Sequence, residues 1–486
     1  MRLHLLPFLA LAACSHNAPP ASGAGESSLT ATSTASSVKV ASKPTKRPLE
    51  ERVSELHKEA LASRDAVDFV RAITRDVGHR LAGSPNDAKA VQWAEKRLVA
   101  GGFTSVHRES VMVTRWERGA ASGSIVSKGK RAPLDLLALG RSGSTPPGGI
   151  EAPVVRVETL AAAEALGRKE LEGKILFLDV AMPRERDGSG YAHAAPTRYR
   201  GSQVAHERGA VAMIVRSLSP NPSVPHTGTT GQVGSVSVAV SGTSADALRD
   251  TLARDPKAKV HLESSAKTLP DVESFNVVGD IRGTERPDEV VLLGAHLDSW
   301  DVGEGASDDG AGCAIVTEAA RLAAKYAPRR TIRVVLFASE ELGGAPGATG
   351  YAKAHAAEAD KFVAAIEADA GEGRSLGFRA NSAPDRVHVV QRLESFLAPL
   401  GVDPSPGEAH PGVDVEPLME KGVPILQLRQ DMSAYFDVHH TKLDVFERID
   451  QASLTQTTAA YAVLAYATAE LDETLGRAPV KAPSPH

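Results

Sequence analysis

Imidazole and carboxylate side chains recur in the second half of this 486-residue chain, each where an apolar run ends or a helical pattern begins. In chain order, these residues are His296, Asp308, Asp309, Glu340, Glu341, Asp369 and His440. Histidine combined with carboxylates, where no cysteine is available as a ligand, suits zinc or another borderline divalent ion. The residue types therefore predict a metal site.

Each of these residues has a simpler explanation when it is taken alone. A single histidine at a strand end is more often structural than a metal ligand. A Glu-Glu pair is usually a solvated helix start, and an Asp-Asp pair commonly caps a helix. Their recurrence at successive strand and helix boundaries, on one edge of a predicted sheet, favours the metal site instead.

The number of candidate ligands predicts two ions. One catalytic zinc usually has three protein ligands, whereas the sequence supplies five, namely His296, Asp308, Glu341, Asp369 and His440. Five ligands that share one carboxylate divide between two metals about 3.5–4 Å apart, where a bridging hydroxide can form. Glu340, a neighbouring carboxylate that is not a ligand, would accept the proton of the water and pass it to the leaving amine.

The elements that position these side chains alternate regularly after residue 276. We expect strands at residues 289–296, 332–339, 363–369 and 424–429, and helices at 310–325, near 347–357 and at 450–471. Such alternation predicts an α/β fold in which helices cover both faces of a mainly parallel sheet. Ligands of such folds collect beyond the carboxyl ends of the strands.

Residues 148–269 have a different pattern, with short β-type runs among loops and helices. Their own apolar segments and turns favour a separate inserted module, although one larger sheet is the alternative. The predicted organisation is a signal segment at residues 1–14, a disordered linker at 15–48, the first part of a main domain at 49–147, the insertion at 148–269, the rest of the main domain at 270–474, and a flexible tail at 475–486. Two helical patterns, at 50–77 and 86–100, open the main domain.

The amino terminus predicts export. Arg2 precedes an apolar run that ends in Leu-Ala-Ala-Cys, a layout typical of a bacterial lipoprotein signal in which Cys14 is lipidated. An ordinary signal peptide with an incidental cysteine is the alternative. We therefore expect an exported protein, either lipid-anchored to the bacterial cell envelope (outer membrane or periplasmic face) or extracellular.

Composition excludes some classes of function. A hydrophobic fraction of 42% is ordinary for a soluble protein with a full core. The formal net charge of −5, with no basic stripe interleaved with aromatic residues, argues against a nucleic-acid partner. Cys313, on a predicted helix, is expected to be a buried core residue.

Four segments, HLDSWDVGEGASDDGAG, FASEELGGAPGATGY, AIEADAG and HHTKLD, resemble the motif regions of the co-catalytic di-zinc exopeptidases of the aminopeptidase family. The resemblance extends from about residue 71 over most of the chain and is strongest to the carboxypeptidase Q (plasma glutamate carboxypeptidase) branch. It implies a three-layer α/β/α zinc-exopeptidase (phosphorylase/hydrolase-like) fold that binds two Zn²⁺ ions and cleaves terminal peptide bonds of short peptides or dipeptides. Aminopeptidase, dipeptidase and carboxypeptidase activities share these motifs and stay open.

The same resemblance implies a role for each ligand. His296 and Asp369 would bind one ion, Glu341 and His440 the other, and Asp308 would bridge them. The peptide between Asp308 and the next residue is often cis in this family. Glu340, which precedes Glu341, would be the general base.

The resemblance implies roles for three further residues. Asp298 would fix the tautomer of His296 and raise its basicity. His439 lies where some relatives carry a tyrosine that polarises the scissile carbonyl, so it is either a hydrogen-bond donor there or a packed histidine. Asp414 resembles a loop position close to the substrate, where a carboxylate could pair with a free amino terminus, although an acidic loop residue is usually just solvated.

The resemblance also identifies the insertion as a protease-associated domain, which in relatives lies over the mouth of the active site. Relatives of this branch are often dimers, which leaves a homodimer open for this chain. Two alternatives on the same fold are a glutaminyl cyclase, an acyl transferase with one zinc, and a non-catalytic receptor-like module. The complete set of five ligands favours the peptidase.

Overall fold

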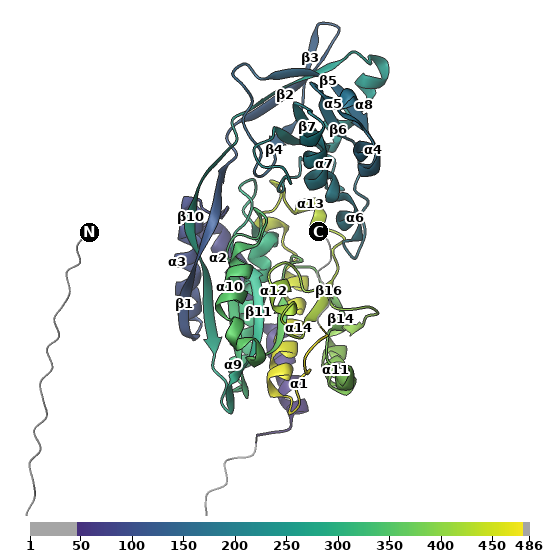
Figure 1. Cartoon of the computed structure of the whole chain (residues 1–486). Coiled ribbons are helices and arrows are strands. Elements are labelled where there is room, and N and C mark those ends of the chain that lie inside the picture. Colours follow the sequence, from purple (N-terminus) through teal and green to yellow (C-terminus); the bar gives the residue numbers. More distant parts are fainter. Residues whose placement is uncertain (1–45, 480–486) are drawn as a thin grey trace, which may run out of the picture. The chain divides into compact units, whose positions relative to one another are not determined.

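The computed structural model describes residues 46–479 (Figure 1). The predicted signal segment, Cys14 and most of the linker lie outside the described residues, as does the end of the predicted tail. The described residues from Arg47 onward belong to one compact unit. None of the helices in that range is long and apolar enough to cross a membrane.

A five-stranded sheet with the order β1-β10-β12-β11-β13 forms the centre of the main domain. Its strands are β1 (Thr104–Glu117), β10 (Lys267–Ile281), β11 (Arg286–His296), β12 (Arg330–Phe337) and β13 (Phe362–Glu367). β11 pairs in parallel with β12 and β13, as predicted, but β10 pairs antiparallel with both β1 and β12. The sheet is therefore mixed, and a second sheet lies between β1 and β10 in the sequence.

Helices cover both faces of this sheet. On β11, Val291, Leu293 and Ala295 face one hydrophobic core, and the alternate residues Val290 and Leu292 face the other, as the two-residue period of a strand requires. The first core is formed with α1 (Leu49–Ala62), α2 (Asp65–Asp76), α3 (Pro85–Ala100), α9 (Gly312–Ala324), α11 (Val387–Leu397) and α14 (Gln451–Glu470). The second is formed with α10 (Pro346–Ala354) and α12 (Glu416–Met419). The predicted three-layer arrangement is therefore confirmed.

Residues 50–77, predicted as one helical segment, form two helices, α1 and α2. α1 ends at Ala62, and Ser63 has an extended backbone with ψ 143°. The Ser63 hydroxyl accepts a hydrogen bond from the backbone N–H of Asp65, the first residue of α2, at 3.2 Å. The prediction of a single helix was wrong because no Gly or Pro marks this break.

The main domain also contains a small sheet in its last part and several short helices. The order β15-β14-β16 joins β14 (Ser375–Ala380), β15 (Asp403–Pro404) and β16 (Leu426–Gln430). A single bridge between Ala365 and Ile425 connects this region to β13. The short elements are η1 (Ala306–Ala311), η2 (Ala356–Lys361), η3 (Pro384–Arg386), η4 (Ala398–Leu400), α13 (Tyr435–Val438) and η5 (Phe446–Arg448).

A second sheet, with the order β3-β2-β9-β5-β6-β7-β8-β4, lies between β1 and β10 in the sequence. Its strands are β2 (Ala121–Ser127), β3 (Lys130–Pro133), β4 (Leu136–Ala138), β5 (Ile150–Val157), β6 (Ile175–Leu178), β7 (Ala212–Arg216), β8 (Ser237–Val240) and β9 (Lys259–Ser264). Its helices are α4 (Leu160–Glu164), α5 (Arg168–Leu171), α6 (Ser189–Ala194), α7 (Pro196–Glu207) and α8 (Gly242–Arg254). The sheet includes three strands that precede residue 148, the predicted start of the insertion. We refer to residues 121–264 as the β2–β9 module.

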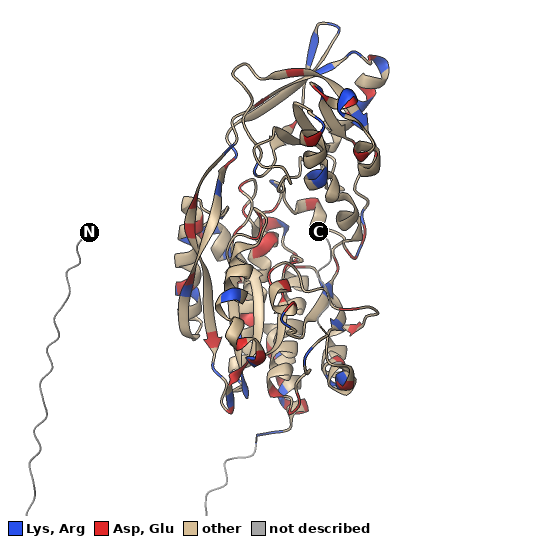
Figure 2. Cartoon of the chain, viewed as in Figure 1, with Lys and Arg blue, Asp and Glu red and all other residues tan. Residues whose placement is uncertain are grey.

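Basic and acidic residues are interspersed along the described elements (Figure 2). This distribution agrees with the small formal net charge of −5.

Candidate metal centre

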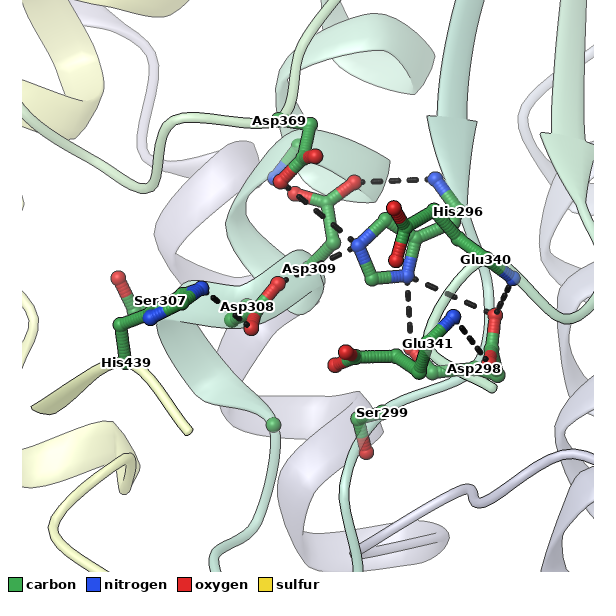
Figure 3. Close-up of polar contacts among 12 residues, drawn as sticks. His296, Asp298, Ser299, Ser307, Asp308, Asp309, Glu340, Glu341, Asp369 and His439 are labelled. Atoms are coloured by element: carbon green, nitrogen blue, oxygen red, sulfur yellow. Dashed lines mark hydrogen bonds and ion pairs between the residues drawn. The ribbon is translucent and has the colours of Figure 1, made fainter. Parts of the chain in front are cut away.

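Three neighbouring strands bring the predicted residues to one edge of the central sheet (Figure 3). His296 is the last residue of β11, Glu340 and Glu341 follow the end of β12, and Asp369 follows the end of β13. Because these three strands are parallel neighbours, their carboxyl ends lie at the same edge. Asp308 reaches this edge from η1, which runs into α9.

Asp308 lies between two groups of candidate ligands. On one side, His296 Nε2 is 3.2 Å from Asp308 Oδ1 and 3.7 Å from Asp369 Oδ1. On the other, His440 Nε2 is 3.2 Å from Asp308 Oδ2 and 3.0 Å from Glu341 Oε2. Each carboxylate oxygen of Asp308 therefore faces a different histidine, and the structure brings all five predicted ligands together.

The chemistry of this donor set fits a metal ion. Asp308 Oδ2, Glu341 Oε1 and His440 Nδ1 are buried and have no hydrogen-bond partner among residues 46–479. Potential ligand atoms of His296, Asp308 and Glu341 lie within 4.8 Å of one another. Buried carboxylate oxygens without partners are costly, and a bound cation would offset that cost. Two imidazoles and three carboxylates are ligands that zinc accepts.

The electrostatics of the site also favour cations. Burial, together with the neighbouring Asp308 carboxylate, raises the pKa of Glu341 well above its ordinary value. Burial acts in the same direction on Glu340, where the nearby Asp369 also raises the pKa. Carboxyl groups crowded into one buried region stay ionised only if positive charge is supplied.

Asp298 holds the loop that carries both glutamates. Its carboxylate accepts hydrogen bonds from the backbone N–H groups of Glu340 at 3.0 Å and Glu341 at 3.3 Å (Figure 3). His296 Nδ1 is 3.1 Å from the backbone oxygen of Asp298 and 3.6 Å from its carboxylate. Asp298 therefore contacts the His296 ring mainly through its carbonyl, while its carboxylate positions the neighbouring loop.

Asp309 anchors the start of α9. Its carboxylate accepts hydrogen bonds from the backbone N–H groups of His296 and Gly312, each at 3.0 Å. The peptide bond between Asp308 and Asp309 is cis, as the resemblance implies. Asp308 therefore faces the histidines, whereas Asp309 connects the start of α9 to the end of β11 through hydrogen bonds.

Asp444 connects the two halves of the site. Its carboxylate accepts hydrogen bonds from the backbone N–H groups of Ser307 at 2.6 Å and Asp308 at 3.2 Å. Burial, with Asp308 nearby, raises the pKa of Asp444 to about 8. The loop that supplies His440 therefore also fixes the backbone of Asp308.

A loop of the β2–β9 module reaches the metal centre. The backbone N–H of Thr227 donates to the carbonyl oxygen of His440 at 2.8 Å. The hydroxyl of Thr229 donates to the carbonyl oxygen of Glu341 at 2.7 Å. The module is therefore hydrogen-bonded directly to the backbone of two predicted ligands.

His226 of the same loop contacts His439. His226 Nε2 is 3.1 Å from His439 Nδ1, and both side chains are buried. The His439 ring stacks on the ring of His440, with centroids 3.6 Å apart, and its Nε2 lies 3.6 Å from Asp308 Oδ2. Tyr191 packs edge-on against His439 from the module side.

A cavity of about 340 Å³ opens on the candidate ligands. Asp308, Glu340 and His440 line it from the main domain, and Tyr191 and Arg198 line it from the β2–β9 module. The main domain and the β2–β9 module thus line one cavity together.

Asp414 does not line this cavity, although the adjacent Val413 does. Its side chain is buried, and both carboxylate oxygens have no partner among residues 46–479. Glu367 accepts a hydrogen bond from its backbone N–H at 2.8 Å. Burial raises the pKa of Asp414 to about 8.

His226, Arg198 and Tyr191 were not predicted as site residues. His226 stands alone in the segment VPHTGTTG, and Arg198 lies in the helical segment PTRYRG. Neither segment has the spacing of a ligand motif, so only the folded arrangement identifies these residues.

The comparisons with known proteins decide the family. A model of peptidase family M28 matches residues 276–465. Carboxypeptidase Q of Mus musculus is 36% identical over 412 residues, which cover 82% of this chain and 85% of that protein. The chain belongs to peptidase family M28. Carboxypeptidase Q of Homo sapiens is 33% identical over 412 residues, covering 82% of this M28 peptidase and 84% of the human protein.

Solved structures agree with this assignment. A peptidase M28 precursor from Shewanella amazonensis SB2B has 40% sequence identity and a TM-score of 0.86, and the match covers 89% of this chain and 99% of that one. A zinc aminopeptidase from Bacillus subtilis, at 19% identity, has a TM-score of 0.61 and shares the fold, with 86% and 98% covered. This M28 peptidase is a metallo-exopeptidase, as the sequence predicted.

Proposed function

We propose that the protein binds two Zn²⁺ ions and hydrolyses terminal peptide bonds of short peptides or dipeptides. His296 and Asp369 would hold one ion. Glu341 and His440 would hold the other, and Asp308 would contact both. The observation that carries this proposal is that the two carboxylate oxygens of Asp308 face different histidines, each 3.2 Å away. A carboxylate shared in this way is typical of two-metal hydrolases.

Glu340 would act as the general base. It lines the cavity beside the candidate ligands, and Asp298 fixes its backbone. When bound, the zinc ions would acidify a water molecule and polarise the scissile carbonyl. Glu340 would take the proton from the attacking water and deliver it to the leaving amine.

His439 would donate a hydrogen bond to the carbonyl oxygen of the substrate. Its Nδ1 faces His226 Nε2, and His226 Nδ1 is buried without a partner among residues 46–479. An unpaired acceptor costs less than an unpaired N–H, so we assign the shared proton to His226 Nε2. Neutral His439 then carries its own proton on Nε2, the nitrogen nearer to Asp308. This tautomer supports a donor role, because a hydrogen bond to the developing oxyanion lowers the barrier.

The β2–β9 module would act as a protease-associated domain that restricts entry to short substrates. Its loop contacts at His440 and Glu341 support this role. Asp414 would pair with a free amino terminus: both of its carboxylate oxygens have no partner in the described chain, and the adjacent Val413, rather than Asp414 itself, lines the cavity.

Metal content and activity measured together test the proposal. The zinc-loaded protein should contain two zinc ions per chain, lose hydrolysis of dipeptides on chelation and regain it when zinc is added. One ion per chain, with cyclisation of peptides that begin with glutamine, would support the glutaminyl cyclase alternative. Absence of both metal binding and hydrolysis would support the receptor-like alternative.

Export, the lipid anchor at Cys14 and a homodimer stay predictions. Cys14 lies outside the described residues.

A further inference from the structure

Arg118 lies where the main domain meets the β2–β9 module. It falls between β1, which ends at Glu117, and β2, which begins at Ala121, and 12% of its side chain is exposed. It does not line the cavity at the candidate metal centre. Its contacts nevertheless lead to His440 by two separate routes.

The Arg118 guanidinium joins the module to the main domain. Nε donates to both carboxylate oxygens of Asp301, at 3.0 and 3.1 Å, and Nη2 also donates to Asp301. Nη1 donates to the hydroxyl of Thr227 at 3.0 Å and to the carbonyl oxygen of Ala138. Asp301 belongs to the loop after β11, whereas Thr227 and Ala138 belong to the module. Every guanidinium nitrogen therefore has an acceptor, and Arg118 fixes the module loop relative to the loop after β11.

The first route to His440 runs through the main chain. The backbone N–H of Thr227 donates to the carbonyl oxygen of His440 at 2.8 Å. His440 has φ 57°, in the left-handed region, which is costly for a residue with a β-carbon. Such a backbone persists only where its surroundings fix it. The hydrogen bond from Thr227 is one such restraint, and Arg118 in turn holds Thr227.

The second route runs through an aromatic ring. The Arg118 guanidinium carbon lies 5.5 Å from the centroid of the Trp300 ring, within the range of a cation–π contact. The Trp300 ring in turn packs edge-on against the His440 ring, with centroids 5.7 Å apart. Because Trp300 precedes Asp301 in the sequence, the ring contact and the ion pair position the same loop. Arg118 thus supports both the backbone and the ring of His440.

We propose that Arg118 is a positioning residue of the metal centre, through which the β2–β9 module completes the zinc site at His440. The inference rests on the proposed function, in which His440 and Glu341 hold one of the two ions. It gives the module a second role, in metal affinity, beside the restriction of substrate entry. Arg118 acts on His440 through Thr227 and Trp300, not by direct contact.

The sign of the change in zinc affinity tests this role. Loss of a positive charge near a cation site would tighten zinc binding by Coulomb attraction, whereas loss of positioning weakens it. R118Q should lower the affinity for the ion at His440 by about 10-fold and for the ion at His296 by less than about threefold. Chelator competition measures both affinities, and anomalous diffraction at limiting zinc identifies the weaker site. Unchanged or tighter binding at His440 would overturn the proposal.

A lysine variant separates charge from geometry. R118K keeps the positive charge but lacks the fork that reaches Asp301 and Thr227 together. We expect it to lose most of the zinc affinity that R118Q loses. The matched control is R131Q, which removes a module arginine that pairs with Glu151 at the surface and should leave both zinc affinities unchanged. Wild-type zinc affinity in R118K would contradict the positioning role.

Hydrogen exchange separates this inference from the proposed function. In the full-length protein, with and without added zinc, the Thr227 amide should exchange about 10-fold faster in R118Q than in wild type, because its bond to His440 opens more often. The amide of Met213, bonded within the module sheet, should exchange equally in both proteins. If wild type binds no zinc, the proposed function fails, and this exchange still decides the role of Arg118. Equal exchange at Thr227 would reject it.

Discussion

His226 Nε2 lies 3.1 Å from Nδ1 of His439, so a residue of the β2–β9 module touches a side chain next to the candidate metal centre. Both rings are buried, and they are 213 positions apart in the sequence. The module also contributes Tyr191 and Arg198 to the lining of the cavity. It therefore forms part of the wall of the candidate metal centre.

Replacing His226 tests whether it sets the tautomer of His439. His226→Ala should lower kcat by on the order of 100-fold with little change in KM, because the donor to the oxyanion is no longer held in place. His226→Gln, which can offer an N–H near the position of Nε2, should recover part of the loss. Nitrogen-15 NMR of the zinc-loaded protein should find the His439 proton on Nε2 in wild type and a mixture of tautomers in His226→Ala. An unchanged kcat in the alanine variant would argue for packing alone.

Two adjacent glutamates should respond differently to the same change. Glu340→Gln should keep both metal ions and lower kcat by on the order of 1,000-fold, because the general base is lost. Glu341→Gln should instead bind less zinc, because a predicted ligand is weakened. Metal analysis and dipeptide hydrolysis on the same samples compare the two. Full activity in metal-replete Glu340→Gln would rule out the assignment of the base.

The sequence predicted the elements that carry the ligands, since β11 is buried at every position from Val290 to His296 and reads as an apolar run. The antiparallel direction of β1 and β10 was not predicted, because their pairing joins segments on either side of the β2–β9 module. His226 and Arg198 were missed for the same physical reason. Their importance depends on long-range packing, and no local pattern records it.

Asp444 should matter for metal affinity although it is not a predicted ligand. Its carboxylate holds the backbone N–H groups of Ser307 and Asp308. Asp444→Ala should weaken zinc binding by about 10- to 100-fold, since groups that orient ligands have effects of this size. Competition with a chromogenic chelator measures the change. As a control, Asp450→Ala, which removes the N-cap of α14, should reduce thermal stability and leave zinc affinity nearly unchanged.

The ion pair between His355 and Glu109 predicts a pH-dependent contribution to stability. His355 Nε2 lies 2.8 Å from Glu109 Oε1, and this contact raises the pKa of His355 above its ordinary value of 6.5. The stabilisation from His355 is therefore fully present below pH 6.5 and is lost as the pH rises through the higher folded-state pKa. Unfolding by urea should find His355→Gln destabilised by about 1 kcal/mol near pH 6 and by less near pH 9.

The control for this experiment is His206→Gln, which changes an exposed histidine of α7. It should have little effect at either pH. A penalty for His355→Gln that grows toward high pH would contradict the assigned direction.

The central claim is that Asp308 joins two metal ions, and anomalous diffraction at the zinc edge from crystals of the zinc-loaded protein tests it most directly. We expect two peaks about 3.5–4 Å apart, one near His296 and Asp369 and the other near His440 and Glu341, with Asp308 between them. A single peak, or two peaks of which only one lies next to Asp308, would contradict the account.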